Sequence, residues 1–169
     1  MRIRTEQEQD CDVISKVTAQ AFAAVKHSNK IESAIVVALR DAKALSLSLV
    51  AESRNEVIGH IALSPVTIGG AAIRWFALGP LSVRPDRQGI GVGGALIRQG
   101  LDHLRALGAA GCVLLGDPAY YRRFGFENDS ALHYKDAPSK YFMMISFGGS
   151  VPVGRVEYHH SFGSHLNGK

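Results

Sequence analysis

Four glycines fall within residues 89–94 of this chain, between an apolar run that ends at Val83 and an amphipathic pattern that begins near Val92. Glycine permits left-handed backbone and lets the main chain approach a ligand closely. At the start of a helix, the first N–H groups lack intrahelical acceptors and lie at the positive end of the helix dipole. The stretch therefore predicts a strand, a tight turn and a helix whose N-terminus binds an anion such as a pyrophosphate.

The strand that leads into this turn carries a defect of its own. Residues 71–83 read as a strand, but Gly79 and Pro80 lie inside it. Proline cannot donate to the ladder, and glycine within a strand favours a bulge. We expect the strand to splay from its neighbour here and to open a slot in the sheet.

The remaining elements are short and mixed in type. A helix is expected from Asp10 or Asp12 to about Ala24, and a second one, begun by an Asn29–Glu32 capping box, ends near Asp41. Asp117 and Pro118 predict a further short helix that ends at Gly125. Alternating or continuous apolar runs predict strands over residues 2–4, 45–51, 57–68, 71–83 and 112–115, with more strands and turns within 126–134, 141–147 and 151–158. This order is typical of an α/β protein with a mixed sheet.

Length and composition indicate one ordinary globular domain, residues 1–169, with a flexible tail at about 160–169. Hydrophobic residues make up 46% of the chain and charged residues 20%. The net charge of +4 suits a small anionic ligand, but the basic residues are scattered, which argues against a nucleic-acid partner. No stretch approaches the roughly 20 apolar residues of a membrane span, so no membrane partner is expected.

Cysteine and histidine usage points to a reducing compartment and to no metal. Cys11 and Cys112 lie far apart and are expected to be free buried thiols. The N-terminus lacks the apolar core of a signal peptide, so the expected location is cytoplasmic. The histidines near the C-terminus show no metal-ligand spacing with any identified partner; they are His159, His160 and His165.

Residues 89–94 (GIGVGG) also match G-x-G-x-x-G, the fingerprint of dinucleotide-binding proteins, and Asp117 lies about where a ribose-binding acid is found. The context argues against this interpretation. Five residues, 84–88, separate the strand from the first glycine, and the motif lies in mid-chain behind a strand meander. A purely structural glycine turn is a further alternative.

Residues 88–93 (QGIGVG) are similar to the Q/R-x-x-G-x-G/A segment of the GNAT superfamily of N-acetyltransferases. Residues 120–126 (YYRRFGF) resemble the family's F-Y-x-x-x-G-F element after the fifth strand, and residues 116–121 (GDPAYY) look like a bacterial branch of predicted acetyltransferases. The resemblance covers most of the chain. It implies a GNAT-like α/β fold: a mixed, largely antiparallel central sheet of six to seven strands, with helices on both faces, splayed between strands four and five.

The resemblance also implies acetyl-CoA as co-substrate, lying in that slot with its pyrophosphate on the glycine turn. Arg84 and Arg87 either add charge near the phosphates or are solvated surface residues. The residues implied to bind the cofactor are Leu81 and Val83, through their backbone, and Gln88, Gly89, Ile90, Gly91, Val92, Gly93 and Gly94.

The implied reaction is direct attack of a primary amine on the acetyl thioester within a ternary complex. A backbone N–H near Leu81 would stabilise the oxyanion, and Tyr121 matches the family tyrosine that protonates the leaving thiolate. The alternative for Tyr121 is a packing role only. A packing role is the one expected of Tyr120. Family members usually have an asparagine seven residues before this tyrosine; Leu114 occupies that position here. Asp117 either contacts the cofactor or only caps its helix.

The general base is left open, because residues 71–83 contain no carboxylate. His60 is a candidate, against the alternative of a structural histidine, and Glu32 or a water chain are others. Two functions therefore stand side by side: an N-acetyltransferase for a small-molecule or peptide amine, and a non-catalytic acyl-CoA-binding or sensor module. Family members often pair, so a homodimer is a possible assembly.

Overall fold

The computed structural model describes residues 1–135 and 137–163. Its helices and strands follow the expected order closely. The strands are β1 (Arg2–Thr5), β2 (Leu47–Ser53), β3 (Glu56–Ile68), β4 (Ala71–Val83), β5 (Gly111–Leu115), β6 (Leu132–His133), β7 (Phe142–Ser146) and β8 (Gly154–Glu157). The helices are α1 (Cys11–Ala23), α2 (Glu32–Asp41), α3 (Val92–Ala106) and α4 (Pro118–Tyr121), with several short 3₁₀ turns between them.

The described strands form one open sheet with the path β1-β2-β3-β4-β5-β7, to which β8 and the two-residue β6 are attached. Pairing along the path is antiparallel except between β4 and β5, which are parallel. The far end of β3 also pairs with β8. The mixed, largely antiparallel sheet is therefore confirmed; it has eight strands rather than six to seven because β6 and β8 form short pairs of their own.

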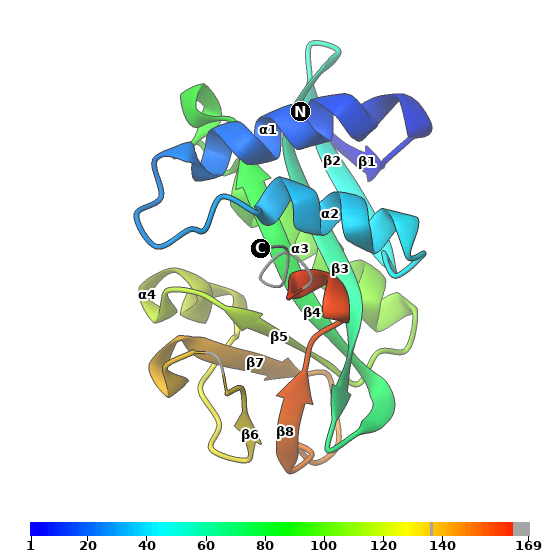
Figure 1. Cartoon of the computed structure of the whole chain (residues 1–169), viewed down its shortest axis with the longest axis vertical. Helices are drawn as coiled ribbons and strands as arrows, with labels where there is room; N and C mark the ends of the chain where they lie inside the picture. Colours follow the sequence, from blue (N-terminus) through cyan, green and yellow to red (C-terminus); the bar gives the residue numbers. More distant parts are fainter. Residues whose placement is uncertain (136, 164–169) are drawn as a thin grey trace.

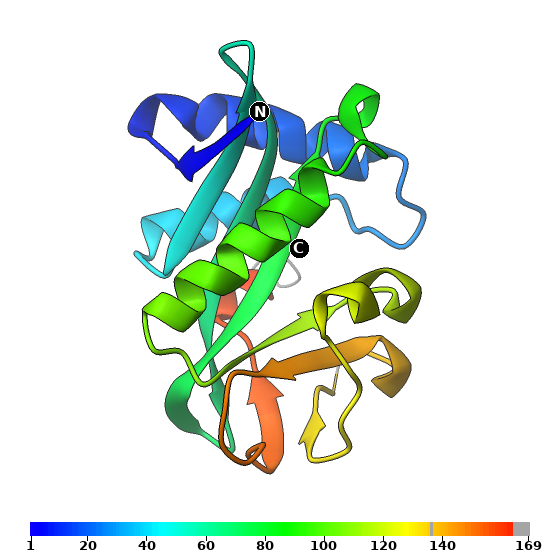
Figure 2. The same ribbon diagram turned by 180° about the vertical axis from the view of Figure 1, so that it is seen from behind.

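Helices cover both faces of the sheet, as expected. In Figure 1, α1 and α2 lie in front of β2, β3 and β4. Figure 2 shows the opposite face, which is crossed diagonally by α3. β5 and β7 turn away from β4 in both views, so that the lower part of the sheet diverges from the upper part.

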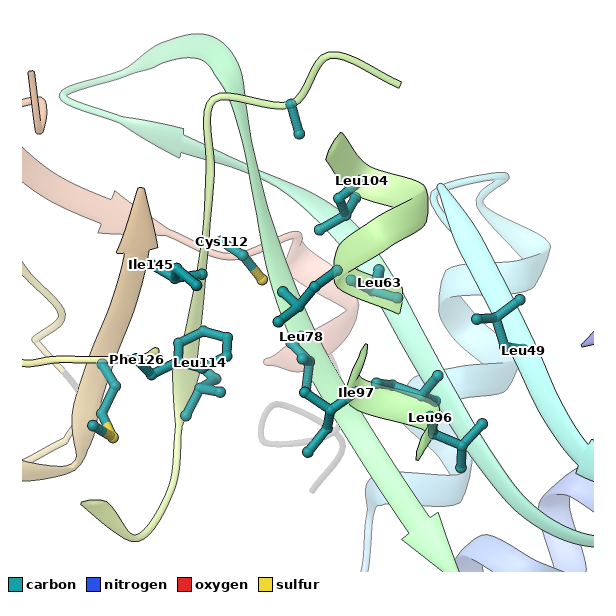
Figure 3. Packing of buried hydrophobic residues seen from close by; sticks show 14 of the residues in the cluster. Leu49, Leu63, Leu78, Leu96, Ile97, Leu104, Cys112, Leu114, Phe126 and Ile145 are labelled. Atoms are coloured by element: carbon teal, nitrogen blue, oxygen red, sulfur yellow. The ribbon is translucent and has the colours of Figure 1, made fainter. Parts of the chain in front are cut away.

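The main core lies between α3 and the sheet. The apolar positions of α3, among them Leu96, Ile97 and Leu104, pack onto side chains from β2, β3, β4 and β5 (Figure 3). The strand side chains of this cluster include Leu49, Leu63, Leu78, Cys112 and Leu114. Gly100 allows the helix to approach closely, since a methyl group there would lie 3.3 Å from Cδ1 of Leu63. Burial of such side chains contributes roughly 1.5–3 kcal/mol each, which holds the α3 N-terminus against β4.

Two predicted helix caps are wrong in their details. Asp10 precedes α1, but its carboxylate accepts hydrogen bonds from Arg4 and from the Gln7 backbone instead of capping the helix. Glu32 begins α2 and accepts from the Ser28 hydroxyl, so no Asn29–Glu32 box forms. In each case the carboxylate accepts a hydrogen bond from a donor outside the helix and does not cap the helix.

β2 is buried on both faces, because helices lie on each side of it, although the alternating pattern of residues 45–51 is typical of a half-buried strand. At the start of the predicted tail, His160–Phe162 form a 3₁₀ turn, Ser161 is buried, and Phe162 packs against the cluster that contains Ile35 and Leu39 of α2. The rest of that predicted tail, residues 164–169, lies outside the described residues.

Candidate active site

The sheet opens between β4 and β5. The two strands pair only at Trp75, Phe76 and Ala77 of β4, although β4 continues to Val83. The predicted defect lies just beyond the last pair: Ile61 of β3 is opposite Leu81, whereas Leu63 is opposite Leu78, so Gly79 and Pro80 form a bulge. The predicted splay is therefore confirmed, and it leaves the second half of β4 without a neighbour on one side.

The free side of β4 presents backbone polar groups. The N–H of Arg84 donates to the carbonyl of Ile58 on β3 (2.9 Å). Since every second residue of an antiparallel strand bonds to the same neighbour, this bond shows which residues of β4 bond to β3. Ser82 therefore bonds with β3, and the N–H and C=O groups of Leu81 and Val83 point the other way, toward the slot. An extended ligand with amide groups can pair with such an edge as an additional strand.

The glycine turn forms the end wall of the slot. Gly89 and Gly91 have φ values of +75° and +90°, a conformation that favours glycine, and Gly91 is the N-cap of α3. Among the described residues, none accepts a hydrogen bond from the backbone N–H groups of residues 89–94. Gln88 ties the turn to the strand, because its Nε2 donates to the Val83 carbonyl at 3.0 Å. The turn is thus held in place with its donors free.

A cleft of about 660 Å³ joins these features. Its floor and end come from β4 and the glycine turn, one wall from α4 and the 3₁₀ turn after it, and another from the C-terminal part of α1. Of the residues predicted to bind the cofactor, all but Ile90 line it; Ile90 is 68% exposed. The lining residues are Ala21, Phe22, Val25, Leu81, Val83, Arg87, Gln88, Gly89, Gly91, Val92, Gly93, Gly94, Arg98, Tyr120, Tyr121, Arg123 and Phe124.

Tyr121 lies in this cleft at the end of β5. Its ring is directly over Gly116, where a methyl group would lie 2.6 Å from Cδ2 and closer still to Cε2. Phe126 meets the ring edge-on from another side, with the two ring centroids 6.1 Å apart. Burial, with a smaller contribution from Tyr120, raises the pKa of the Tyr121 phenol to about 12. The hydroxyl is therefore protonated at neutral pH and able to donate.

Among the described residues that line the cleft, the charged ones are three arginines. Arg98 and Arg123 form no ion pair with any described residue, and their guanidinium groups lie over the rings of Phe124 (5.4 Å) and Tyr120 (4.8 Å). Arg87 is only weakly engaged, with its Nε 3.4 Å from Asp86. This surface is built to attract an anionic ligand.

Of the two arginines weighed from the sequence, only Arg87 lines the cleft. Arg84 instead pairs with Asp86 and Glu56, with its nearest nitrogen atoms 2.6 and 3.1 Å from their carboxylate oxygens. Sequence reasoning missed Arg98 and Arg123. Arg98 lies four residues after Gly94 on α3, and a search for basic residues one helical turn beyond the glycines would have found it.

His60 is completely buried, away from the cleft lining. Its Nε2 lies 2.8 Å from the Ser48 hydroxyl, which donates in turn to Glu6, and Arg40 binds the same carboxylate at 2.8 and 3.0 Å. Burial lowers the pKa of His60 to about 4, despite the Glu6 charge. A general base must be reachable from the substrate, so this position favours the structural alternative.

Asp117 and Glu32 also have local partners. The Asp117 carboxylate accepts from the Ala119 N–H at 2.9 Å and so caps α4; the side chain does not line the cleft. Glu32 is held by Ser28. Of the alternatives left open by the sequence, the cap is the contact seen for Asp117.

The two thiols are free, and neither lines the cleft. Cys112 is completely buried, and this burial raises its pKa. Cys11 is only partly buried, contrary to expectation, and lies at the opposite end of α1 from Phe22. Within residues 1–135 and 137–163, no cluster of His, Cys, Asp or Glu has the arrangement of a metal site; His165 lies outside them.

Known proteins share both the sequence pattern and the fold. Residues 44–128 match the family described as "Acetyltransferase (GNAT) domain". The uncharacterized N-acetyltransferase YhbS of Escherichia coli (strain K12) is 34% identical over 169 residues, which cover 96% of this chain and 98% of YhbS. The chain belongs to the GNAT acetyltransferase family. The family resemblance seen in residues 88–93 and 120–126 is therefore confirmed, and the dinucleotide interpretation is set aside.

Two solved structures match this acetyltransferase over nearly its whole length. One is a GNAT family acetyltransferase from Brucella melitensis in complex with acetyl-CoA, with 54% identity, a TM-score of 0.87 and coverage of 95% of this chain and 97% of the other. The second is YhbS from Escherichia coli in complex with CoA, with 34% identity, a TM-score of 0.88 and coverage of 96% and 91%. No described helix of the present chain has the length and apolarity needed to span a bilayer.

Proposed function

We propose that this acetyltransferase uses acetyl-CoA and transfers the acetyl group to a primary amine by direct attack within a ternary complex. The observation that carries the proposal is one cleft that combines the open backbone edge of β4, the free N–H groups of the glycine turn and the Tyr121 phenol. The acceptor in this proposal is a small molecule or a peptide amine. The enzyme acts in the cytoplasm as a single domain, with a homodimer as one assembly.

The backbone groups and the charge of the cleft match those of acetyl-CoA. The pantetheine arm carries amides that match the unpaired N–H groups of Leu81 and Val83 on β4. A pyrophosphate fits the N–H groups of residues 89–94, and Arg98 and Arg123 supply positive charge nearby. The acetyl-CoA and CoA complexes of the two similar structures support the same ligand class.

In the reaction, the amine nitrogen attacks the thioester carbonyl carbon, the C–S bond breaks, and the thiolate takes a proton. The N–H of Leu81 points into the slot, where it can stabilise the negative oxygen of the tetrahedral intermediate. Tyr121 donates to the departing sulfur. Its pKa of about 12 lies above the roughly 8.5 of an ordinary thiol, but burial raises the pKa of the leaving thiol as well and narrows that gap.

Direct attack is favoured over an acetyl-enzyme intermediate because the described residues that line the cleft include no cysteine, serine or lysine nucleophile. They also include no carboxylate or histidine. In our proposal the amine proton therefore leaves to water, after the neutral form of the amine has bound. The rate is then expected to rise with pH until the amine acceptor is deprotonated.

The proposal is tested by measuring CoA release with a panel of primary amines. With an accepted amine, initial rates at varied concentrations of both substrates should give intersecting lines, as for a ternary complex. Tyr121→Phe should lower kcat about 100-fold while the KM for acetyl-CoA stays nearly unchanged. A Tyr121→Phe variant with wild-type turnover would refute the assignment of the acid, and parallel lines would refute direct attack.

A non-catalytic acyl-CoA-binding or sensor module remains the second candidate. It is favoured by the described lining of the cleft, which contains no carboxylate or histidine to serve as a general base. The two functions differ in turnover but share CoA binding. Tight binding of CoA without acetylation of any amine, peptide N-termini included, would favour the module.

A further inference from the structure

Tyr120 and Tyr121 are adjacent in α4, yet their rings diverge. The ring centroids are 5.0 Å apart and the ring planes are nearly perpendicular, at 88°. Each ring approaches a different glycine: Tyr121 lies over Gly116 at the end of β5, whereas the Tyr120 hydroxyl is directed at Gly93 in the first turn of α3. The two hydroxyl groups therefore serve different parts of one cleft.

The position of the Tyr120 hydroxyl is close and specific. A methyl group on Gly93 would lie 3.1 Å from this oxygen, so the hydroxyl rests against the helix where the free N–H groups of the glycine turn begin. Among the described residues it has no hydrogen-bond partner of its own. A residue that only packs here needs no hydroxyl, and phenylalanine would provide the same ring.

The charge around Tyr120 is positive. The guanidinium carbon of Arg123 lies 4.8 Å from the centre of the Tyr120 ring, and Arg123 forms no ion pair within the described residues. A cation on the ring face strengthens the phenol as a donor, and it adds to the positive end of α3. An anion at the glycine turn would thus meet backbone N–H groups, a phenol O–H and a guanidinium.

We infer that the two tyrosines serve opposite ends of the cofactor: the Tyr120 hydroxyl donates to a phosphate held at the α3 N-terminus, and Tyr121 serves the thioester at the end of β5. The inference rests on the proposed use of acetyl-CoA. It gives Tyr120 a binding role in place of the packing role expected from the sequence.

The test compares two matched variants, Tyr120→Phe and Tyr121→Phe, each of which removes one hydroxyl and keeps the ring. Calorimetric titration is carried out with CoA and with 3′-phosphoadenosine 5′-diphosphate, which is the nucleotide half of CoA. Tyr120→Phe should weaken the binding of both ligands about tenfold, the loss expected for a hydrogen bond to a charged group. Tyr121→Phe should bind the nucleotide half as the wild type does.

Unchanged CoA affinity in Tyr120→Phe would overturn the inference. Weaker binding of CoA with unchanged binding of the nucleotide half would also overturn it, because the hydroxyl would then act at the pantetheine end. Both variants should keep the wild-type unfolding midpoint, which excludes a loss of fold as the cause. A wild-type protein that does not bind CoA would overturn the proposed function itself, whereas the other outcomes leave that function standing.

Discussion

Gly116 shows how a single residue without a side chain sets the position of the proposed acid. Its backbone lies outside the left-handed region, so an alanine is compatible with the conformation of the main chain. The space is the obstacle, because the Tyr121 ring occupies the place of the missing methyl group. Glycine at 116 is therefore explained by the ring that lies on it, in contrast to Gly89 and Gly91, where the φ angle requires glycine.

We expect Gly116→Ala to displace the Tyr121 ring and to lower kcat tenfold or more, with little change in the KM for acetyl-CoA. Catalysis depends on a hydroxyl placed within hydrogen-bond distance of the reacting sulfur, so a small shift of the ring is costly. The measurement is steady-state CoA release with an amine accepted by the wild type.

A double-mutant cycle separates positioning from general damage. In the Tyr121→Phe background, Gly116→Ala should lower kcat no further, since no hydroxyl is left to misplace. Gly163→Ala is the matched control, because among the described residues a methyl group there meets its nearest neighbour only at 3.9 Å, and the φ angle is ordinary. Additive losses in the cycle would show that Gly116 acts on the fold rather than on Tyr121.

At the scale of elements, β4 and α4 build the cleft together. β4 pairs with β3 up to Val83 but leaves β5 after Ala77, and this divergence makes the slot. α4 is only four residues long, so a cap and the aromatic contacts must fix its position. Asp117 provides that cap through the Ala119 N–H.

The capping role predicts different results for two substitutions of Asp117. Asp117→Asn removes the charge but keeps the acceptor, so CoA affinity and the free energy of unfolding should both remain close to wild type. Asp117→Ala removes the acceptor and should lower the free energy of unfolding by about 1 kcal/mol. Denaturant titration and CoA binding check both. A loss of CoA affinity in Asp117→Asn would instead indicate that the carboxylate contacts the cofactor.

Elements specified by nearby residues could be predicted from the sequence. The bulge at Gly79–Pro80, the α3 start after Gly91 and the Asp117 cap all depend on residues within a few positions of each other. Local residues were not always enough: the Asp10 cap and the Asn29–Glu32 box were wrong because Arg4 and Ser28, which are also close in sequence, compete for the two carboxylates. Arg98 and Arg123 were missed for another reason: their place in the cleft depends on how α3 and α4 pack.

At the scale of the whole molecule, a partly buried polar network joins parts of the chain that are distant in sequence. Glu6 follows β1, Arg40 lies in the last turn of α2, and Ser48 and His60 belong to β2 and β3. No local pattern links these positions, so the sequence offered His60 only as a candidate base. The fold places it instead in this network, in which its Nε2 has the Ser48 hydroxyl as a partner, whereas its buried Nδ1 has no hydrogen-bond partner among the described residues.

This network predicts how stability depends on pH. His60 has a pKa of about 4 in the folded protein, against 6.5 when unperturbed, because burial disfavours its charged form. As the pH falls below 6.5, the unfolded chain binds a proton at this position while the folded protein does not. The free energy of unfolding should therefore drop by about 2 kcal/mol between pH 7 and pH 5. Denaturant titration at the two pH values measures it.

Two carboxylates, Glu6 and Asp10, also affect stability, but in a lower pH range than His60. Hydrogen bonds from Arg40 and Ser48 outweigh the opposing effect of burial and lower the pKa of Glu6, and the Arg4 hydrogen bond lowers that of Asp10. Their stabilisation is present above the ordinary values of 4.5 and 3.8 and is lost only below them. A decrease in the free energy of unfolding between pH 7 and pH 5 is thus assigned to histidine, and His60→Gln should remove most of this decrease. If the variant shows the same decrease as the wild type, another group is responsible. The next residue to substitute is then His159, whose pKa is also lowered.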